Sequence, residues 1–255
     1  VYNSPKNKLG KEKSKKIFLN EYTKQKIKAE QICEDNNALI LRTNFFANKK
    51  RSLFKWIIDN AKGDKEYFLF NDIYFNPHGH GTHTESHGHI SKEVYPVSHC
   101  FNQFFFDAQL ITIIPDIIGG DRVITAEQLR DLSPCDALVI RTEPNYLSKS
   151  TTNYSDTNPT YMDVACVDIL NECGIKHLLV DIPSVDKEID GGILAFHHAF
   201  WNVPENQVLD RTITELIYVP SEVEDGSYIL ELQVSNFEND AAPSRPLLYK
   251  KRKEA

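Results

Sequence analysis

The chain has 255 residues and a formal net charge of −7, and hydrophobic residues make up 41% of it. This length allows a sizeable core within one domain, and the acidic balance argues against nucleic-acid binding, which needs Lys and Arg to neutralise phosphates. No apolar run approaches the roughly 20 residues of a membrane-spanning helix. We therefore expect no nucleic acid and no membrane among the partners.

The five cysteines show no CxxC spacing. This usage is typical of reduced thiols in a cytosol-like compartment. We expect a cytoplasmic protein, and the start at Val1 is also compatible with a removed leader.

Residues 1–65 are predicted to form an N-terminal segment with a basic start, because residues 1–16 carry six lysines. Basic chain ends of this length are more often solvated than bound to a membrane or a nucleic acid. Within the segment, residues 24–33 and 51–63 have the apolar spacing of amphipathic helices, and the apolar run at 38–46 predicts a buried strand.

Residues 66–255 show the patterns of a folded core. Strand-like alternation runs over residues 66–75. Beyond the histidine-rich stretch the pattern predicts strands at 108–114, 136–142 and 177–183, helices at 125–132 and 160–174, and three closing strands at 212–219, 227–234 and 245–250. Alternating elements followed by consecutive strands predict an α/β fold with a mixed β-sheet core and flanking helices, in one compact domain overall.

Local signals bound the two predicted helices of this core. Thr125 and Gln128 have the spacing of a capping box at the start of the first helix. Thr160 is the predicted N-cap of the second helix, and Gly174 is its predicted end.

The segment NPHGHGTHTESHGHI, residues 76–90, holds five of the nine histidines. Side chains alternate along an extended chain, so one face would carry His83, Glu85, His87 and His89. His78 and His80 share a parity as well. Several imidazoles and one carboxylate on a common face match the ligand set of zinc or a similar divalent ion. The alternative is a surface histidine-rich loop that binds metal adventitiously.

Two residues of this segment are suited to more than simple ligation. The carboxylate of Glu85 can bridge two metal ions, which histidine cannot do. His89 ends the run and can serve as a base for a metal-bound water. His87 is equally compatible with a surface position and with a place in the pocket.

Several blocks together resemble the cyclase family of metal-dependent hydrolases, which includes the bacterial kynurenine formamidases. GTHTESHGH is similar to the family signature HxGTHxDxPxH. The segments DALVIRT, GIKHLLVDIPSVD, AFHHAFW, TITELI and APSRPLLY resemble further family blocks in the same order, across roughly residues 70–250. The resemblance implies the swivelling β/α/β fold of kynurenine formamidase, and a homo-oligomer, either a dimer or a tetramer.

By position, the resemblance implies a role for five residues. His83 matches a ligand of the first metal, and Glu85 takes the place of an aspartate that bridges two zinc ions. His89 matches the general acid/base. His197 and Glu215 match the residues that complete the second metal site. Glu215 lies in an otherwise apolar strand, where a buried carboxylate needs a partner.

The chain departs from the family pattern at two of the implied ligands. Strict register places Gly79 where the family has its first metal histidine. His78 is the favoured substitute because it follows Pro77 at the end of a strand, and His80 is the alternative. Glu85 is one methylene longer than aspartate, so either one or two ions are expected, Zn²⁺ first and Mn²⁺ as an alternative.

These observations predict a metal-dependent amidohydrolase that cleaves the C–N bond of a small-molecule amide or cyclic amide. A metal ion would activate water, and His89 would accept its proton and return it to the leaving nitrogen. The resemblance makes N-formylkynurenine, an arylformamide, a candidate substrate. The alternative is a metal- or ligand-binding protein that keeps the fold without turnover.

Overall fold

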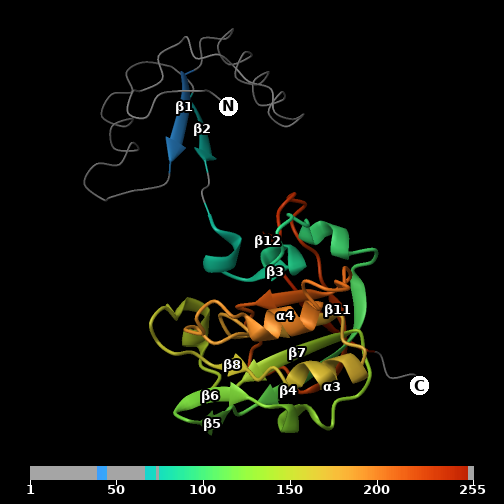
Figure 1. Cartoon of the computed structure of the whole chain (residues 1–255). Coiled ribbons are helices and arrows are strands. Elements are labelled where there is room, and N and C mark those ends of the chain that lie inside the picture. Colours follow the sequence, from blue (N-terminus) through green and yellow to red (C-terminus); the bar gives the residue numbers. More distant parts are fainter. Residues whose placement is uncertain (1–38, 45–66, 73–74, 252–255) are drawn as a thin grey trace. The chain divides into compact units, whose positions relative to one another are not determined.

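The computed structural model describes residues 75–251 and the backbone of two further strands, at 39–44 and 67–72. The chain divides into two compact units, Val1–Phe75 and Asn76–Ala255. In the first unit, β1 (Leu39–Asn44) pairs in parallel with β2 (Tyr67–Asp72) (Figure 1). Both strands lie inside predicted ones, and the helices predicted at 24–33 and 51–63 fall outside the described residues.

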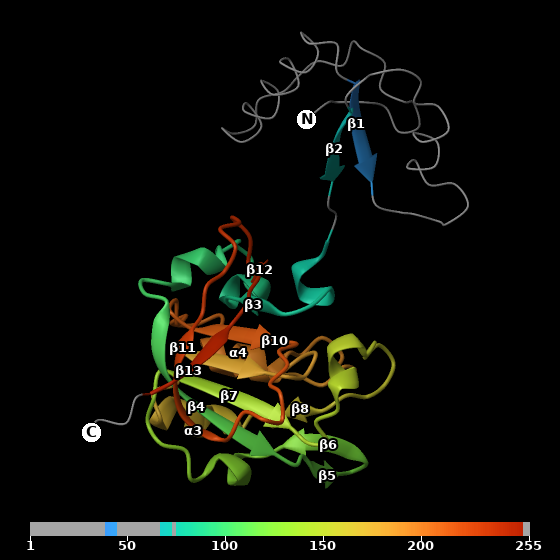
Figure 2. The same cartoon turned by 180° about the vertical axis from the view of Figure 1, so that it is seen from behind.

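An eight-stranded mixed sheet forms the framework of the second unit. Its strand order is β12-β3-β10-β9-β7-β4-β11-β13. The central strands run parallel and are β4 (Phe105–Ile113), β7 (Ala137–Thr142), β9 (His177–Val180) and β10 (Thr212–Glu215). Four further strands flank them, and each pairs antiparallel with its neighbour on the side of the sheet centre. They are β3 (His83–Glu85), β12 (Ala241–Pro243), β11 (Gly226–Glu231) and β13 (Leu247–Lys250) (Figure 2). The predicted α/β fold with a mixed sheet is confirmed.

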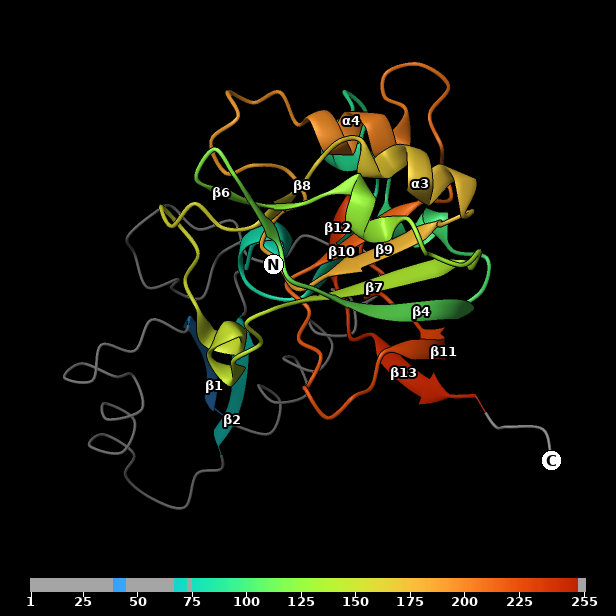
Figure 3. The same cartoon turned by 90° about the horizontal axis from the view of Figure 1, so that it is seen from below.

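Two helices cover one face of this sheet. These are α3 (Cys166–Glu172) and α4 (Ala195–Trp201), and both lie on the same side of β4, β7 and β9 (Figure 3). Between helices and sheet lies a core that includes Leu138, Leu178 and Phe200. Alternate residues point to the opposite face, where Val139 and Leu179 belong to a second core. Both faces of the central strands are therefore buried, which explains their nearly continuous apolar sequences.

A smaller sheet and several single-turn helices complete the unit. The sheet contains β5 (Asp116–Ile118), β6 (Asp121–Ile124) and β8 (Tyr161–Met162). The 3₁₀ helices are η1 (Pro77–Gly79), η2 (His87–His89), η3 (Val97–Cys100), η4 (Ala126–Leu129) and η5 (Leu147–Thr151). Within the described part of the chain, no helix is both long and apolar enough to cross a membrane.

Both helices predicted for the core are shorter than their patterns suggested. The stretch predicted at 125–132 forms only the single turn η4, which keeps a capping-box hydrogen bond from Thr125 N to Gln128 Oε1 (3.1 Å). The helix predicted at 160–174 begins at Cys166, because the residues after Thr160 join the small sheet as β8. Thr160 as its N-cap was therefore wrong, whereas Gly174, at φ +74°, ends the helix as predicted.

The four described cysteines are free thiols, as expected. Cys100 and Cys166 are buried, and Cys135 and Cys173 are partly buried.

Three polar residues mark the carboxyl ends of parallel strands. Thr142 ends β7, Asp181 directly follows β9, and Glu215 ends β10. All three are buried. Ligands of open α/β sheets bind at this edge, so it is the place to look for a site.

Candidate metal centre

Six of the predicted site residues converge around the short strand β3. They come from five elements of the chain, which meet there. The residues are His78 in η1, His83 and Glu85 in β3, His89 in η2, His197 in α4 and Glu215 at the end of β10. The predicted alternative His80 lies outside this cluster, is exposed, and accepts a hydrogen bond from Asn76 N at its Nδ1 (3.0 Å).

The register between β3 and β10 places two carboxylates beside one imidazole. His83 and Glu85 are two residues apart on a strand and therefore share a face. Glu215 is the direct cross-strand neighbour of His83. His83 Nε2 lies 3.5 Å from Glu215 Oε2 and 3.8 Å from Glu85 Oε2, and all three residues are buried.

Helix α4 contributes His197, whose ring is held from both sides. Asp186 Oδ2 accepts from His197 Nδ1 (2.5 Å), and Asp186 Oδ1 accepts from the backbone N of Phe196 (2.8 Å). On the other side, His197 Nε2 lies 3.0 Å from Glu85 Oε1. A carboxylate behind a histidine fixes its tautomer and raises its basicity toward a metal ion, so Asp186 orients His197 for ligation through Nε2.

In His83, as in His197, Nδ1 contacts an acceptor of the protein and Nε2 faces the cluster. Its Nδ1 donates to Gly81 O (3.0 Å), which leaves the lone pair on Nε2. Among the described residues, His83 Nε2 and Glu85 Oε2 are buried without a hydrogen-bond partner, although Glu85 Oε2 lies 2.9 Å from His78 Nδ1. Buried polar atoms without partners are costly unless something else binds them. Nitrogen and carboxylate donors of this kind fit a divalent metal ion.

His78 reaches the cluster from η1 and is tied to a carboxylate that the sequence analysis did not identify. Its Nδ1 faces Glu85, and its Nε2 lies 2.7 Å from Asp240 Oδ2. The same Asp240 oxygen lies 3.6 Å from His89 Nδ1. One carboxylate thus contacts both His78 and His89, whose ring centroids are 4.1 Å apart.

The chain turns after β3, so the predicted extended run does not continue to His89. Residues 87–89 form η2, which is capped by Ser86 through its side-chain acceptance from Gly88 N (3.2 Å). His87 consequently packs against Tyr95 at 4.4 Å between ring centroids and is buried away from the cluster. A Cβ on Gly88 would lie 2.6 Å from Tyr95 O, so only glycine fits in this turn.

Charge in the cluster favours a bound cation. Burial by itself lowers the pKa of His78 and His197, but neighbouring carboxylates outweigh it and raise both pKa values to about 10; Asp240 and Glu85 act on His78, and Asp186 and Glu85 on His197. Burial raises the pKa of Glu85, but His197 and His78 outweigh that effect and hold this pKa well below its usual range. The carboxylates thus attract positive charge, in the form of a proton or a metal ion.

Two potential ligand sets share Glu85. One combines it with His78 and His83, and the other with His89 and His197; in each set the donor atoms lie within 4.8 Å of one another. A shared carboxylate is the arrangement expected for two neighbouring ions, and either set alone has the donors for one ion.

Asp186 and Asp240 are the site residues that sequence reasoning missed. Asp186 ends the block DIPSVD, so its position was known but its contact with His197 was not. Asp240 stands three residues before Pro243 in a segment without histidines. The pairing of β12 with β3, in which Ala241 is opposite Glu85, brings it to the site.

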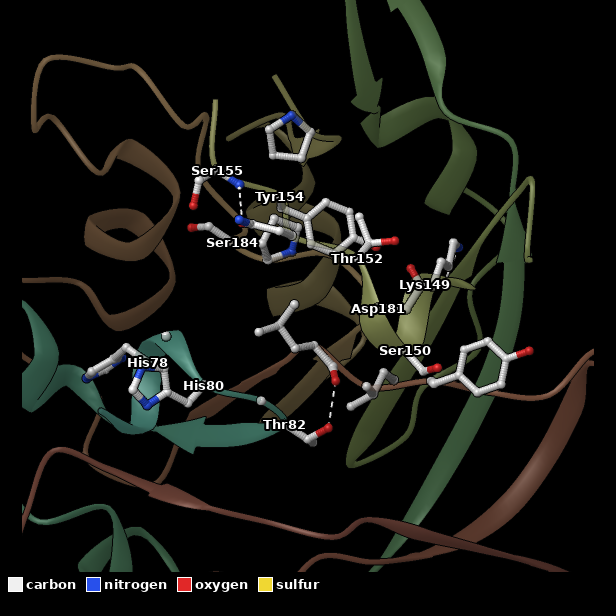
Figure 4. A pocket seen from close by; sticks show the side chains of 18 of the residues that line it. His78, His80, Thr82, Lys149, Ser150, Thr152, Tyr154, Ser155, Asp181 and Ser184 are labelled. Atoms are coloured by element: carbon white, nitrogen blue, oxygen red, sulfur yellow. Dashed lines mark hydrogen bonds and ion pairs between the residues drawn. The ribbon is translucent and has the colours of Figure 1, made fainter. Parts of the chain in front are cut away.

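A cavity of about 780 Å³ adjoins the cluster and includes His78 and Asp186 in its wall. The rest of the wall comes from residues 79–82, 149–155, 216–218, Pro159 and the segment that follows β9. Figure 4 shows His78 and His80 on one side of the cavity and Lys149 and Asp181 on another. A small organic molecule in this cavity would lie next to the candidate metal ligands.

Solved structures with the same fold include several proteins described as metal-dependent hydrolases. A potential metal-dependent hydrolase with cyclase activity is 17% identical, with a TM-score of 0.56 over 71% of this chain and 83% of that one. A predicted metal-dependent hydrolase from Bacillus stearothermophilus is 17% identical, with a TM-score of 0.50 over 69% and 79%. An isatin hydrolase bound to the product analogue thioisatinate is 13% identical, with a TM-score of 0.50 over 71% and 75%.

The sequence was also compared with curated proteins and with family patterns. No curated protein matches the chain. The pattern of the family described as putative cyclase matches residues 41–187, which is more than half of the chain. The match begins in β1 and includes the histidine segment and the strands β4, β7 and β9. The chain therefore belongs to the putative cyclase family, as its sequence motifs predicted.

Proposed function

We propose that the protein is a metal-dependent hydrolase that cleaves the C–N bond of an amide or cyclic amide. The observation that carries this proposal is the pair of ligand sets that share the buried Glu85 beside a cavity. The fold shared with hydrolases supports it, and isatin, which one of them hydrolyses, contains a cyclic amide. N-formylkynurenine and related arylformamides are candidate substrates because of the resemblance of the motifs.

The residues present can hold one or two ions, for which we propose Zn²⁺, with Mn²⁺ as the alternative. His78, His83 and Glu85 would hold the first ion. Glu85 and His197 would hold the second together with Glu215, whose Oε1 lies 4.0 Å from His197 Nε2. Glu215 here takes the place of His89, for which the resemblance implies the role of acid/base. When bound, such an ion polarises a carbonyl oxygen and makes water more acidic. Asp186 and Gly81 O keep the Nε2 lone pairs of His197 and His83 directed at the cluster.

His89 is the proposed general acid/base. It lies beside the ligands, with its ring centroid 5.5 Å from that of His197, and its side chain is 30% exposed. A base in this position can accept the proton of the attacking water and return it to the leaving nitrogen. Asp240 Oδ2 lies 3.6 Å from His89 Nδ1.

The test combines metal analysis with an assay of the purified protein. N-formylkynurenine and simple cyclic amides are incubated with protein before and after chelation, and the rate is followed. We expect hydrolysis that stops on chelation and returns with Zn²⁺ or Mn²⁺. His89→Ala should lower kcat by about 10²-fold or more and keep the bound metal. The control is His99→Ala, an exposed histidine outside the site.

Metal content separates His78 from His80. His78→Ala should lose bound metal, whereas His80→Ala should keep it, because His80 lies outside the cluster. If metal-replete protein hydrolyses none of these amides, the hydrolase proposal is wrong, and a metal- or ligand-binding protein without turnover takes its place.

A further inference from the structure

Several hydroxyl groups in the wall of the cavity have already donated their protons within the protein. Ser150 Oγ donates to Leu147 O (2.8 Å), and Thr82 Oγ1 donates to Leu216 O (2.6 Å) (Figure 4). A hydroxyl carries one proton, so each of these oxygens offers only lone pairs to a ligand. A hydroxyl that donates to a substrate must therefore come from another part of the wall.

The wall also contains side-chain donors that no described protein group accepts from. Besides the histidines they are Asn153 Nδ2 and the hydroxyl groups of Tyr154, Ser155, Ser184 and Tyr218. Asn153 and Ser155 are exposed, and the tyrosine hydroxyls lie at the far end of a ring. Ser184 differs from all of these, because it is half-buried and its hydroxyl is one bond from Cβ. The backbone therefore determines where this hydroxyl lies.

Ser184 stands in a turn whose next two residues contact proposed metal ligands. Its Oγ accepts from the backbone N of Asp186 (3.2 Å), which is the contact of an ST-turn. Val185 donates its backbone N to Glu215 Oε1 (2.9 Å). Asp186 Oδ2 accepts from His197 Nδ1 (2.5 Å). The position of the Ser184 hydroxyl relative to Glu215 and His197 is thus fixed by the same turn that holds these two side chains.

These contacts leave the proton of Ser184 for a ligand. The hydrogen bond from Asp186 N uses a lone pair of Oγ, and no described residue accepts the O–H. Ser184 lines the cavity, as His78 and Asp186 do (Figure 4). A small amide whose scissile bond lies at the candidate ligands would place its neighbouring groups within reach of this hydroxyl.

We infer that Ser184 is a specificity-determining residue, which donates a hydrogen bond to an acceptor oxygen of the substrate beside the scissile amide. The inference rests on the proposed function and narrows its substrate class to amides that carry a second oxygen acceptor next to the amide group. N-formylkynurenine and isatin both have this feature, because each carries a ketone on the ring carbon next to the one that bears nitrogen.

The experiment uses two arylformamides of nearly the same shape. N-(2-acetylphenyl)formamide carries a ketone oxygen beside the amide, and N-(2-isopropenylphenyl)formamide carries a CH₂ group in place of that oxygen. Release of formate is measured for both with the metal-loaded full chain, and their binding is measured by calorimetry. The quantity compared is kcat/KM for the ketone divided by kcat/KM for the alkene. The intrinsic reactivity of each compound cancels when this ratio is compared between parent and variant.

Ser184→Ala removes the hydroxyl and should lower this ratio by about three- to tenfold, the effect of one neutral hydrogen bond. Ser184→Thr keeps a hydroxyl and should restore the ratio. The matched control is Ser150→Ala, which should keep the ratio of the parent because the Ser150 proton is already donated to Leu147 O. Circular dichroism establishes that each variant is folded. Ser184→Gly, which also lacks the hydroxyl, replaces the alanine variant if that variant does not fold.

A role of Ser184 in its turn alone gives a different result. Loss of the hydrogen bond from Asp186 N would slow both compounds together and leave their ratio unchanged, which would overturn the inference. An equal fall of the ratio in Ser150→Ala would overturn it as well. If metal-loaded protein hydrolyses neither compound, the proposed function fails. The ratio of the two dissociation constants, compared between the parent and Ser184→Ala, then decides whether Ser184 recognises the ketone.

Discussion

At the scale of single residues, the site depends on which ring nitrogen of each histidine contacts an acceptor of the protein and which faces the cluster. His83 and His197 each give Nδ1 to an acceptor of the protein and direct Nε2 at the cluster. His78 differs, because Asp240 contacts its Nε2 and its Nδ1 faces Glu85. Each ring therefore presents one nitrogen toward Glu85, and the acceptor on its other side decides which nitrogen that is.

Asp240→Asn is expected to lower kcat or metal affinity by about 10–100-fold, the usual effect of losing a carboxylate behind a metal-site histidine. The variant keeps an oxygen acceptor near His78 and His89 but loses the negative charge that faces both rings. Steady-state kinetics and metal analysis are measured together. A lower kcat with full metal content indicates action through His89, and lost metal indicates action through His78.

Glu238→Gln is the matched control for this variant. It removes the same charge two residues away, from an exposed side chain, and should leave kcat and metal content unchanged. If Asp240→Asn also keeps both, the carboxylate has no role in the site.

At the scale of elements, the short strand β3 organises the candidate ligands. All three of its residues are buried between β10 and β12. The single turns η1 and η2 flank it and bring His78 and His89 back to the same place. A longer regular strand would carry its ends away from the cluster, because each residue adds about 3.3 Å.

A further buried histidine lies where two of the parallel strands begin. His177 opens β9, its Nδ1 lies 2.9 Å from Thr212 Oγ1 at the start of β10, and its ring packs against Phe101 and Phe106. Burial lowers the pKa of His177 to about 4. Between pH 6.5 and about 4 the unfolded chain thus binds a proton that the folded chain does not, so the free energy of unfolding falls as the pH falls through this window.

We expect this histidine to account for about 2 kcal/mol of the stability lost between pH 7 and pH 5. Urea unfolding at both pH values measures the loss. His177→Gln should be less sensitive to pH by that amount, because glutamine does not titrate. His99→Gln, which replaces an exposed histidine, should behave like the parent chain. An identical pH dependence of His177→Gln and the parent would contradict the assignment.

At the scale of the whole molecule, metal binding is expected to be coupled to the stability of the second unit. The ligands come from β3, α4, β10 and the single turns, so an ion would join segments separated by more than 100 residues. A ligand that binds only the folded state stabilises it by about 4 kcal/mol at a thousand times its Kd.

Chelation should therefore lower the Tm of metal-loaded protein by about 10 °C, as each kcal/mol shifts the Tm of a unit of this size by about 2–4 °C. Differential scanning fluorimetry with and without chelator measures the shift. His83→Ala, which removes one ligand from the centre of the cluster, should show little response to the chelator. A Tm that responds equally in the parent and in His83→Ala would show that the chelator does not act through this site.

The amino-acid sequence alone determined the fold class and most of the candidate ligands. Strand–helix alternation and the types of metal-donor side chain in the histidine segment are local properties of the sequence. His197 and Glu215 were identified as candidate ligands from the order of the motifs across the chain and their resemblance to the family. The start of α3 was predicted too early in the chain. Tyr161 and Met162 pair with β6, and this tertiary pairing overrode the local helical pattern.

Only the tertiary structure decided that His78, and not His80, reaches Glu85, and that Asp186 and Asp240 stand behind the histidines. These contacts join residues that are 7 to 162 positions apart in the chain. Their distances follow from the registers of β3 with β10 and β12 and from the turns beside β3. Local sequence does not encode such registers, because they result from the packing of the whole sheet.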